Sequence, residues 1–351
     1  MPRVKSIEFQ TRWQAQLDDC VSALRWSPDG RSVAAAAVSG PIMLFESGTG
    51  TIEQTLRGHG FGTTDLAWRP DGSYFASAGQ DGLVRVWDRS SGAERLALAG
   101  GAAWVEHVAW SPIGDYLASA AGKQLRLWNA AGELLHTYAD HASTISAVQW
   151  KPRTALIKDE KPLLTSAAYG GLRFWLADQA EAAHAFDWKG SILALAWSPD
   201  GQYIATGDQD STVHFWIVAQ GKDLQMWGYP TKVRELAWDC ASRYLATGGG
   251  TTVTVWDCSG KGPEGTRPLQ LDAHEDLISA LAFQHAGALL ASGGQDGRVV
   301  IWEPGKSRKP RTQLTLNAPV TQLYWSPDDR RLAIGMETGE VMVALYATQD
   351  Q

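Results

Sequence analysis

The sequence contains few cysteines, and their spacing indicates neither a disulfide framework nor a zinc site. Cys20, Cys240 and Cys258 are scattered over 351 residues without a Cys-x-x-Cys pair, which favours a reducing compartment. Long apolar runs are also missing. The longest run of small apolar residues, Val33 to Val38, is far too short to cross a bilayer, and the N-terminus lacks the apolar core of a signal peptide. We therefore expect a cytoplasmic protein with no membrane partner.

The chain has no excess of basic residues. It carries 31 Lys and Arg against 38 Asp and Glu, a net charge of −7, which argues against a general electrostatic contact with nucleic acid. One loop is a local exception, with a basic cluster formed by Lys306, Arg308, Lys309 and Arg311. Because the cluster lacks interleaved aromatic residues, weak contact with phosphate or nucleic acid is kept only as an alternative function.

What the sequence does contain is a repeat. Eight short apolar runs end in an aromatic residue, and consecutive runs lie 40 to 47 residues apart: Trp26, Trp68, Trp110, Trp150, Trp197, Trp238, Phe283 and Trp325. Five of the runs continue as Ser/Arg-Pro-Asp/Ile-Gly or Ser-Pro-Asp-Asp. A period of this length, built from short strands and turn residues, is typical of propeller blades.

Each repeat has the pattern of four strands, which we letter a to d. In the second repeat, apolar runs alternate with Pro-Asp-Gly and Asp-Gly turns, which predicts three strands joined by tight hairpins. A fourth apolar segment follows each of the first seven repeats. The sequence therefore predicts antiparallel sheets of four strands.

The dipeptides that flank these strands resemble those of the WD-repeat (WD40) β-propeller family. Gly58-His59 precedes strand a of the second repeat, and Trp87-Asp88 ends its strand c. The resemblance covers roughly residues 7 to 346 and implies an all-β fold. It also implies a rigid, non-catalytic platform for peptides and proteins, without a cofactor.

The strand count suggests how the ring closes. Eight a-b-c units are followed by only seven d strands, so we predict that residues 1–17 supply the missing strand and complete the last blade. The prediction is one domain over residues 1–351, a monomeric eight-bladed propeller with blades that begin near residues 18, 60, 102, 142, 189, 230, 275 and 318. The alternative is seven blades plus an irregular terminal unit.

Two sets of residues have the composition of a hydrolase triad. They are His59, Ser77 and Asp81 with Trp87, and His274, Ser292 and Asp296 with Trp302. The family resemblance implies that each set forms a structural hydrogen-bond chain, and no nucleophile-elbow sequence accompanies either. We therefore predict no catalytic residues and no enzyme. When the fifth repeat is aligned with these two, it keeps Thr206, Asp210 and Trp216 but has Trp188 in place of the histidine.

Three polar residues precede a strand-a Trp by three positions: Asp65, His107 and Glu235. Strand a is innermost in a propeller, so these side chains are candidates for a ligand in the central channel. No close-spaced His or Cys set supports a dedicated metal site. An accessory protein that binds a metal or small ligand in the channel is therefore an alternative function, not the main prediction.

The aromatic residues that the repeat does not require indicate a binding surface. Of 17 tryptophans, Trp13, Trp104, Trp188 and Trp227 lie outside the repeated positions. Trp13 falls in the closing strand, whereas the other three fall near the rim, where aromatic side chains are common interface anchors. We predict a scaffold that binds an unidentified protein or peptide through Phe61, Gln80, Trp104, Ser143, Trp188, Gln209, Tyr229, Asp276 and Gln295. For Trp188 and Tyr229, an alternative is that each fills the space of a missing Gly-His.

Overall fold

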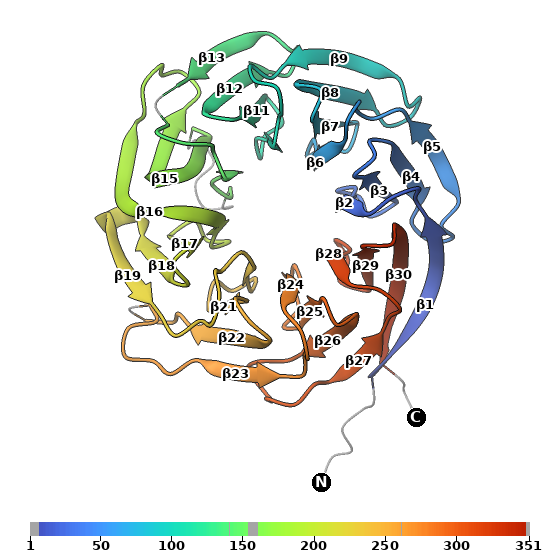
Figure 1. The fold of residues 1–351 in the computed structure, drawn as a ribbon, viewed down its shortest axis with the longest axis vertical. Helices are drawn as coiled ribbons and strands as arrows, with labels where there is room; N and C mark the ends of the chain where they lie inside the picture. The colour runs from blue at the N-terminus through green and yellow to red at the C-terminus, as the bar shows by residue number, and fades with distance from the viewer. Residues whose placement is uncertain (1–6, 140, 154–160, 261, 349–351) are drawn as a thin grey trace.

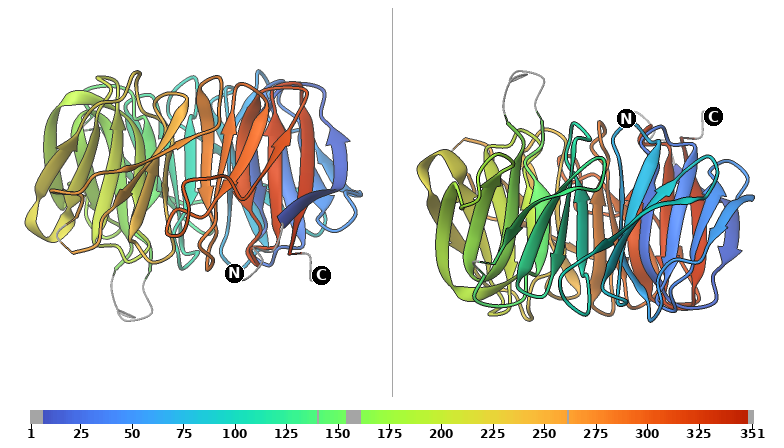
Figure 2. Two further views of the ribbon diagram at one scale, coloured as in Figure 1. Left: turned by 90° about the horizontal axis from the view of Figure 1, so that it is seen from below. Right: turned by 90° about the horizontal axis from the view of Figure 1, so that it is seen from above.

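The protein is a closed ring of β-sheets. The computed structural model describes residues 7–139, 141–153, 161–260 and 262–348. Strand a of each repeat faces the centre of the ring, and the d strands form its outer wall (Figure 1). Side views show strands that span the thickness of the ring and loops that gather at two rims (Figure 2). The top rim carries the d–a loops and b–c turns, such as residues 58–62 and 79–82, and the bottom rim carries the a–b and c–d turns.

Six sheets have four strands each. The first three repeats form β2 (Val21–Trp26), β3 (Ser32–Ala37), β4 (Ile42–Glu46) and β5 (Ile52–Leu56); β6 (Thr63–Trp68), β7 (Tyr74–Gly79), β8 (Leu83–Asp88) and β9 (Glu94–Ala99); and β10 (His107–Trp110), β11 (Tyr116–Ala121), β12 (Gln124–Asn129) and β13 (Leu134–Tyr138). The sixth and seventh repeats form β20 (Leu236–Trp238), β21 (Tyr244–Thr247), β22 (Thr252–Asp257) and β23 (Leu269–Asp272); and β24 (Ile278–Phe283), β25 (Leu290–Gly294), β26 (Arg298–Trp302) and β27 (Thr312–Thr315). The eighth repeat supplies β28 (Val320–Trp325), β29 (Arg331–Met336) and β30 (Glu340–Thr348).

The fourth and fifth repeats share one sheet of six strands. It consists of β14 (Ala147–Trp150), β15 (Leu163–Leu176), β16 (His184–Trp197), β17 (Tyr203–Asp208), β18 (Val213–Ile217) and β19 (Lys222–Met226). β15 contains strands b and c of the fourth repeat. β16 pairs with β15 through its first half and with β17 through its second half.

This shared sheet corrects the predicted blade number. Counted as hydrogen-bonded sheets, the ring has seven blades, and the prediction of eight separate four-stranded blades is wrong. The physical reason is that strand d of the fourth repeat continues into strand a of the fifth as β16, with no intervening loop. The irregular unit is therefore internal and consists of the fourth and fifth repeats. The seven-bladed alternative had placed it at the end of the chain. The long spacing between Trp150 and Trp197 predicts an insertion at residues 153–161 between strands a and b of the fourth repeat, and most of it lies outside the described residues.

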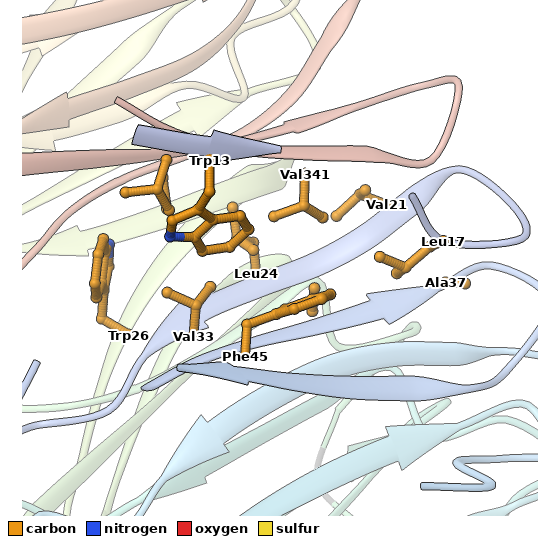
Figure 3. Packing of buried hydrophobic residues seen from close by; sticks show 12 residues of the cluster. Trp13, Leu17, Val21, Leu24, Trp26, Val33, Ala37, Phe45 and Val341 are labelled. Atoms are coloured by element: carbon orange, nitrogen blue, oxygen red, sulfur yellow. The ribbon is translucent and has the colours of Figure 1, made fainter. Parts of the chain in front are cut away.

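The predicted closure by the N-terminal strand is confirmed. β1 (Ile7–Gln16) pairs antiparallel with β30, from Ile7 opposite Thr348 to Gln16 opposite Glu340. Trp13 anchors this strand, because its ring is buried against Phe45 at a centroid distance of 5.3 Å and its Nε1 donates to Ser47 O at 2.9 Å. Figure 3 shows Trp13 in the cluster formed by Val21, Leu24, Val33 and Val341. The two ends of the chain thus protect each other's strand edges.

The strand-a tryptophans connect neighbouring repeats around the ring. Their indole N–H groups donate to a backbone carbonyl one repeat earlier: Trp26 to Tyr324, Trp68 to Arg25, Trp150 to Ala109, Trp238 to Ala196 and Trp325 to Ala282, at 2.9 to 3.4 Å. Trp197 instead donates to Thr165 Oγ1. Since an unpaired buried donor is costly, each of these tryptophans both fills the space between repeats and fixes their register.

Candidate functional site

The top rim has a repeated backbone connection that places many of the predicted contact residues. In three repeats, a glutamine N–H in the b–c turn donates to a carbonyl of the d–a segment: Gln80 to Gly62, Gln209 to Ser191 and Gln295 to Leu277, at 2.8 to 3.0 Å. These bonds use only the backbone, which leaves the side chains of Gln209 and Gln295 exposed and that of Gln80 partly exposed. The b–c turns are therefore held in place by backbone hydrogen bonds, and their glutamine side chains extend from the top rim.

Phe61 and Trp104 belong to two loops that contact the same turn, residues 79–82. A Cβ built on Gly62 would come within 3.4 Å of the Gln80 side chain, and one built on Gly82 would come within 2.8 Å of Ala102 O. Val105, next to Trp104, donates its N–H to Gly79 O at 3.0 Å. Phe61 is 85% exposed and Trp104 is 56% exposed. The structure thus brings these two aromatic residues onto one continuous part of the rim.

Phe61 also has a backbone conformation that a bulky residue rarely adopts. Its φ is +69°, in the left-handed region, which costs roughly 1–2 kcal/mol for a residue with a side chain. The preceding and following residues, Gly60 and Gly62, are glycines. Phenylalanine at this exposed, strained position contributes nothing to the core.

Three further exposed apolar residues on the same rim were missed by the sequence prediction: Val38, Tyr169 and Leu277, which are between 37% and 51% exposed. Trp227, which the sequence placed near the rim without counting it among the contacts, is 71% exposed. Val38 and Tyr169 occupy the b–c turn position that holds Gln80 in the second repeat. Alignment of the repeats could have found them, since an apolar residue replaces a polar one at that position.

Trp188 and Tyr229 are packed into their repeats rather than presented to solvent. The Trp188 ring lies 4.0 Å from that of His214. The Tyr229 hydroxyl accepts from Trp256 Nε1 and pairs with Thr247 Oγ1, both at 2.8 Å, and burial raises the pKa of Tyr229 to about 12. Both residues are half-buried and occupy space where other repeats have Gly-His.

The remaining predicted contacts are polar. Ser143 is half-buried, and its Oγ accepts from the Tyr169 N–H at 3.2 Å. Asp276 is exposed, and its carboxylate accepts from the Leu277 N–H at 2.7 Å. Both side chains therefore shape the loops that carry exposed apolar residues.

The two triad-like sets form buried hydrogen-bond chains. In the second repeat, Trp87 Nε1 donates to Ser77 Oγ at 2.8 Å, and His59 joins Ser77 at 2.7 Å and Asp81 at 2.7 Å. The seventh repeat has the same arrangement, with distances of 2.8, 2.8 and 3.2 Å among Trp302, Ser292, His274 and Asp296. Burial lowers the pKa of His59. The serine oxygens are buried and each already has two partners, so they are not available to attack a substrate.

In the fifth repeat, the hydrogen-bond chain contains a different aspartate from the one that the sequence predicted. Trp216 Nε1 donates to Thr206 Oγ1 at 3.3 Å, and Thr206 donates to Asp208 Oδ2 at 3.3 Å. Asp208 stands where the second repeat has Gly79. Asp210, expected to complete the chain, is exposed and instead accepts from Thr212. Asp208 is fully buried, and this burial, together with the nearby charge of Asp210, raises its pKa to about 8.

The three channel candidates are not brought together. Asp65 forms an ion pair with Arg25 at 3.1 Å and accepts from the backbone N–H of Val108 at 3.3 Å. His107 begins β10 beside it, whereas Glu235 belongs to the sixth repeat, where burial raises the pKa of its carboxyl. No group of three His, Cys, Asp or Glu residues in the described ranges could hold a metal ion. Sequence reasoning missed Arg25, whose guanidinium also lies 4.5 Å from the centre of the Tyr324 ring.

The basic cluster at the bottom rim is partly neutralised. Lys306 lies 2.6 Å and Arg311 3.6 Å from the Glu303 carboxylate, and Arg308 and Lys309 are exposed. Two of the four charges thus have an internal partner, which weakens the case for phosphate contact there. Across the described residues, no helix is long and apolar enough to cross a membrane.

Comparison with known proteins identifies the family of the chain. The model for "WD domain, G-beta repeat" matches residues 50–88, 95–129, 182–216, 221–257 and 265–303, more than half of the chain. A probable cytosolic Fe-S cluster assembly factor of Schizosaccharomyces japonicus is 35% identical over 259 residues, which cover 65% of this chain and 41% of that protein. A WD repeat-containing protein 26 homolog of Arabidopsis thaliana is 37% identical over 65 residues, 18% of this chain and 11% of that protein.

The chain thus spans less than half the length of these curated relatives. Among solved structures, the computationally designed Ika8 protein superimposes with a TM-score of 0.79 over 94% of this chain and 97% of that one, at 23% identity, which is a likeness of fold. The repeat matches, the ring of sheets and the Trp-Ser-His-Asp chains agree with one another. The chain is a member of the WD-repeat family.

Proposed function

We propose that the protein is a non-catalytic scaffold that binds a protein or peptide partner through the top rim, with Phe61 and Trp104 as the main anchors. WD-repeat propellers are generally scaffolds for protein interaction, and the family membership supports this class of function. The observation that carries the proposal is Phe61, an 85% exposed aromatic side chain on a left-handed backbone.

Phe61 supports the proposal because it has an energetic cost and no structural benefit. Strained backbone conformations cluster at sites of binding, where function retains them. A residue that filled a gap would be buried, as Trp188 largely is against His214. The Phe61 side chain is instead exposed to solvent, so it is available to a partner.

The surroundings of Phe61 are those of an interface core with a polar rim. Trp104 approaches the turn at residues 79–82 from the other side, and Gln80 lies between them. Large aromatic side chains bury much area with little loss of entropy, and such residues dominate the binding energy of protein interfaces. Exposed Val38 extends the apolar surface beside the Phe61 loop, because a Cβ on Gly62 would come within 2.6 Å of Val38 O.

The test is affinity capture from the source cell with the wild type and with a Phe61→Ala, Trp104→Ala double variant. We expect the variant to melt at the wild-type temperature and to lose the specifically retained protein. A double variant of Ile52→Ala and Leu134→Ala is the matched control, because both side chains are exposed and apolar but lie on outer d strands. Equal retention by the wild type and the rim variant would refute the proposal.

A further inference from the structure

A pocket lies on the bottom rim, between the second and third repeats. It encloses about 300 Å³ and is lined by Arg69, Tyr74, Val86, Arg95, Leu96, Trp110, Ala130 and Ala131. Its walls come from the a–b segment and strands b, c and d of the second repeat, and from strand a and the c–d turn of the third. None of these residues is part of the top rim, so the pocket is independent of the proposed function.

Trp110 lines this pocket and differs from the other strand-a tryptophans in its indole N–H. Five other strand-a tryptophans donate their indole N–H to a carbonyl of the preceding repeat, but Trp110 Nε1 is buried and has no hydrogen-bond partner among the described residues. The residue is only 8% exposed. A buried donor without a partner destabilises the fold, and an acceptor atom of a ligand could reach it only if the surrounding side chains moved.

Two guanidinium groups give the pocket a positive charge. Arg69 Cζ lies 6.0 Å and Arg95 Cζ 5.8 Å from the centre of the Tyr74 ring, and Arg69 is also 5.9 Å from that of Trp110. Arg69 is held by Asp71 at 3.0 Å and by Gly114 O at 3.1 Å. Arg95 is exposed and forms no ion pair with any carboxylate of the described chain. The Arg69 guanidinium is therefore held in place by its partners, whereas the Arg95 guanidinium is available to pair with an anionic ligand.

These groups together favour an oxyanion that is attached to an apolar stem. Arginine forks match the two oxygens of a carboxylate. The side chains of Val86, Leu96, Ala130 and Ala131 offer apolar walls to methylene groups. We propose that this pocket, the Arg69–Arg95 pocket, binds the carboxylate of a glutamate or aspartate side chain in an acidic peptide.

The experiment measures fluorescence anisotropy of a labelled Leu-Glu-Glu-Leu-Glu-Glu peptide at low salt, with the full chain. The control probe has glutamine in place of each glutamate. We expect the acidic peptide alone to bind, and Arg95→Ala to weaken its binding at least tenfold without a change in melting temperature, since Arg95 is exposed. Lys123→Ala is the matched variant, because it removes one exposed positive charge from a top-rim turn and should leave binding unchanged.

A second readout reports on Trp110 directly. The indole N–H resonance that disappears in Trp110→Phe should shift when the acidic peptide is added to the wild type. Equal binding of the two peptides, equal binding by Arg95→Ala and the wild type, or an unshifted Trp110 resonance would overturn the proposal. Inorganic phosphate or a phosphoserine peptide that binds while the glutamate peptide does not would overturn the carboxylate assignment. Tighter binding of a single-stranded RNA oligonucleotide, lost in Arg95→Ala, would overturn the peptide assignment.

Discussion

Thr206 donates a hydrogen bond to the carboxyl group of Asp208 at 3.3 Å, inside the fifth repeat, where the second repeat pairs Ser77 with His59. Asp208 thus takes over the role of the absent histidine. Its other oxygen, Oδ1, is buried and has no partner among the described residues. The substitution keeps the chain from Trp216 connected but leaves an ionisable group inside the sheet.

Asp208 should make the protein less stable as the pH rises. Burial raises the pKa of Asp208 from a usual value of 3.8 to about 8, so between these values the folded protein holds a proton that the unfolded chain has released. The free energy of unfolding then falls as the pH increases through this window. We expect Asp208→Asn to remove a loss of about 3 kcal/mol between pH 6 and pH 9.

Urea unfolding at several pH values would measure this effect. Asp276→Asn is the control, since Asp276 is exposed on the top rim and should leave the pH profile unchanged. A wild-type profile that is flat between pH 6 and pH 9, or one that Asp208→Asn does not alter, would contradict the assignment.

The same repeat illustrates the limit of sequence reasoning. The segment Gly207-Asp208-Gln209-Asp210 contains two aspartates, and alignment with the second repeat selects Asp210 because Asp81 stands at that place. Burial reverses the choice, since Asp208 is fully buried whereas Asp210 is exposed, and no pattern within the repeat specifies which of the two is buried. Alignment of the repeats predicts the hydrogen-bond chain correctly in the second repeat, which has His59. It fails in the fifth repeat, where Trp188 stands at the position of the histidine.

The shared sheet was likewise beyond the sequence. Residues 184–197 read as two strands separated by Lys189-Gly190, a plausible loop. Whether the two strands join depends on hydrogen bonds to β15 and β17, which are contacts with other segments. By contrast, the closing strand was predictable, because a missing d strand at one end and a spare apolar segment at the other leave one way to protect both edges.

Ser77 should contribute to stability through both of its partners. Its hydroxyl is fully buried between Trp87 Nε1 and His59 Nε2. Ser77→Ala leaves both groups without that partner, and we expect a loss of about 2 kcal/mol in the free energy of unfolding. Ser73→Ala, at an exposed turn of the same repeat, should cost much less. Equal stabilities of the two variants in urea would argue that water replaces the hydroxyl.

Trp13 should account for much of the stability of ring closure. Its ring is buried between Phe45 and the last repeat, and Trp13→Ala should cost about 3–5 kcal/mol. Gln14→Ala, on the exposed face of the same strand, should have little effect. Deletion of residues 1–16 should lower the melting temperature further, because it exposes the edge of β30. An unchanged melt after deletion would mean that the ring does not depend on β1.

Substitutions of Phe61 should distinguish the effect of backbone strain on stability from the effect of the aromatic ring on binding. Glycine adopts a positive φ at no steric cost, whereas alanine retains the strain of phenylalanine. We expect Phe61→Gly to be more stable than Phe61→Ala by about 0.5–1 kcal/mol in urea unfolding, despite the greater flexibility of glycine in the unfolded chain. Both variants should lose partner capture equally, because both lack the aromatic ring.

If Phe61→Gly instead loses more than about 2 kcal/mol relative to the wild type, the side chain stabilises the fold through packing. Phe61 would then be a structural residue, and the anchor of the top rim would have to lie elsewhere.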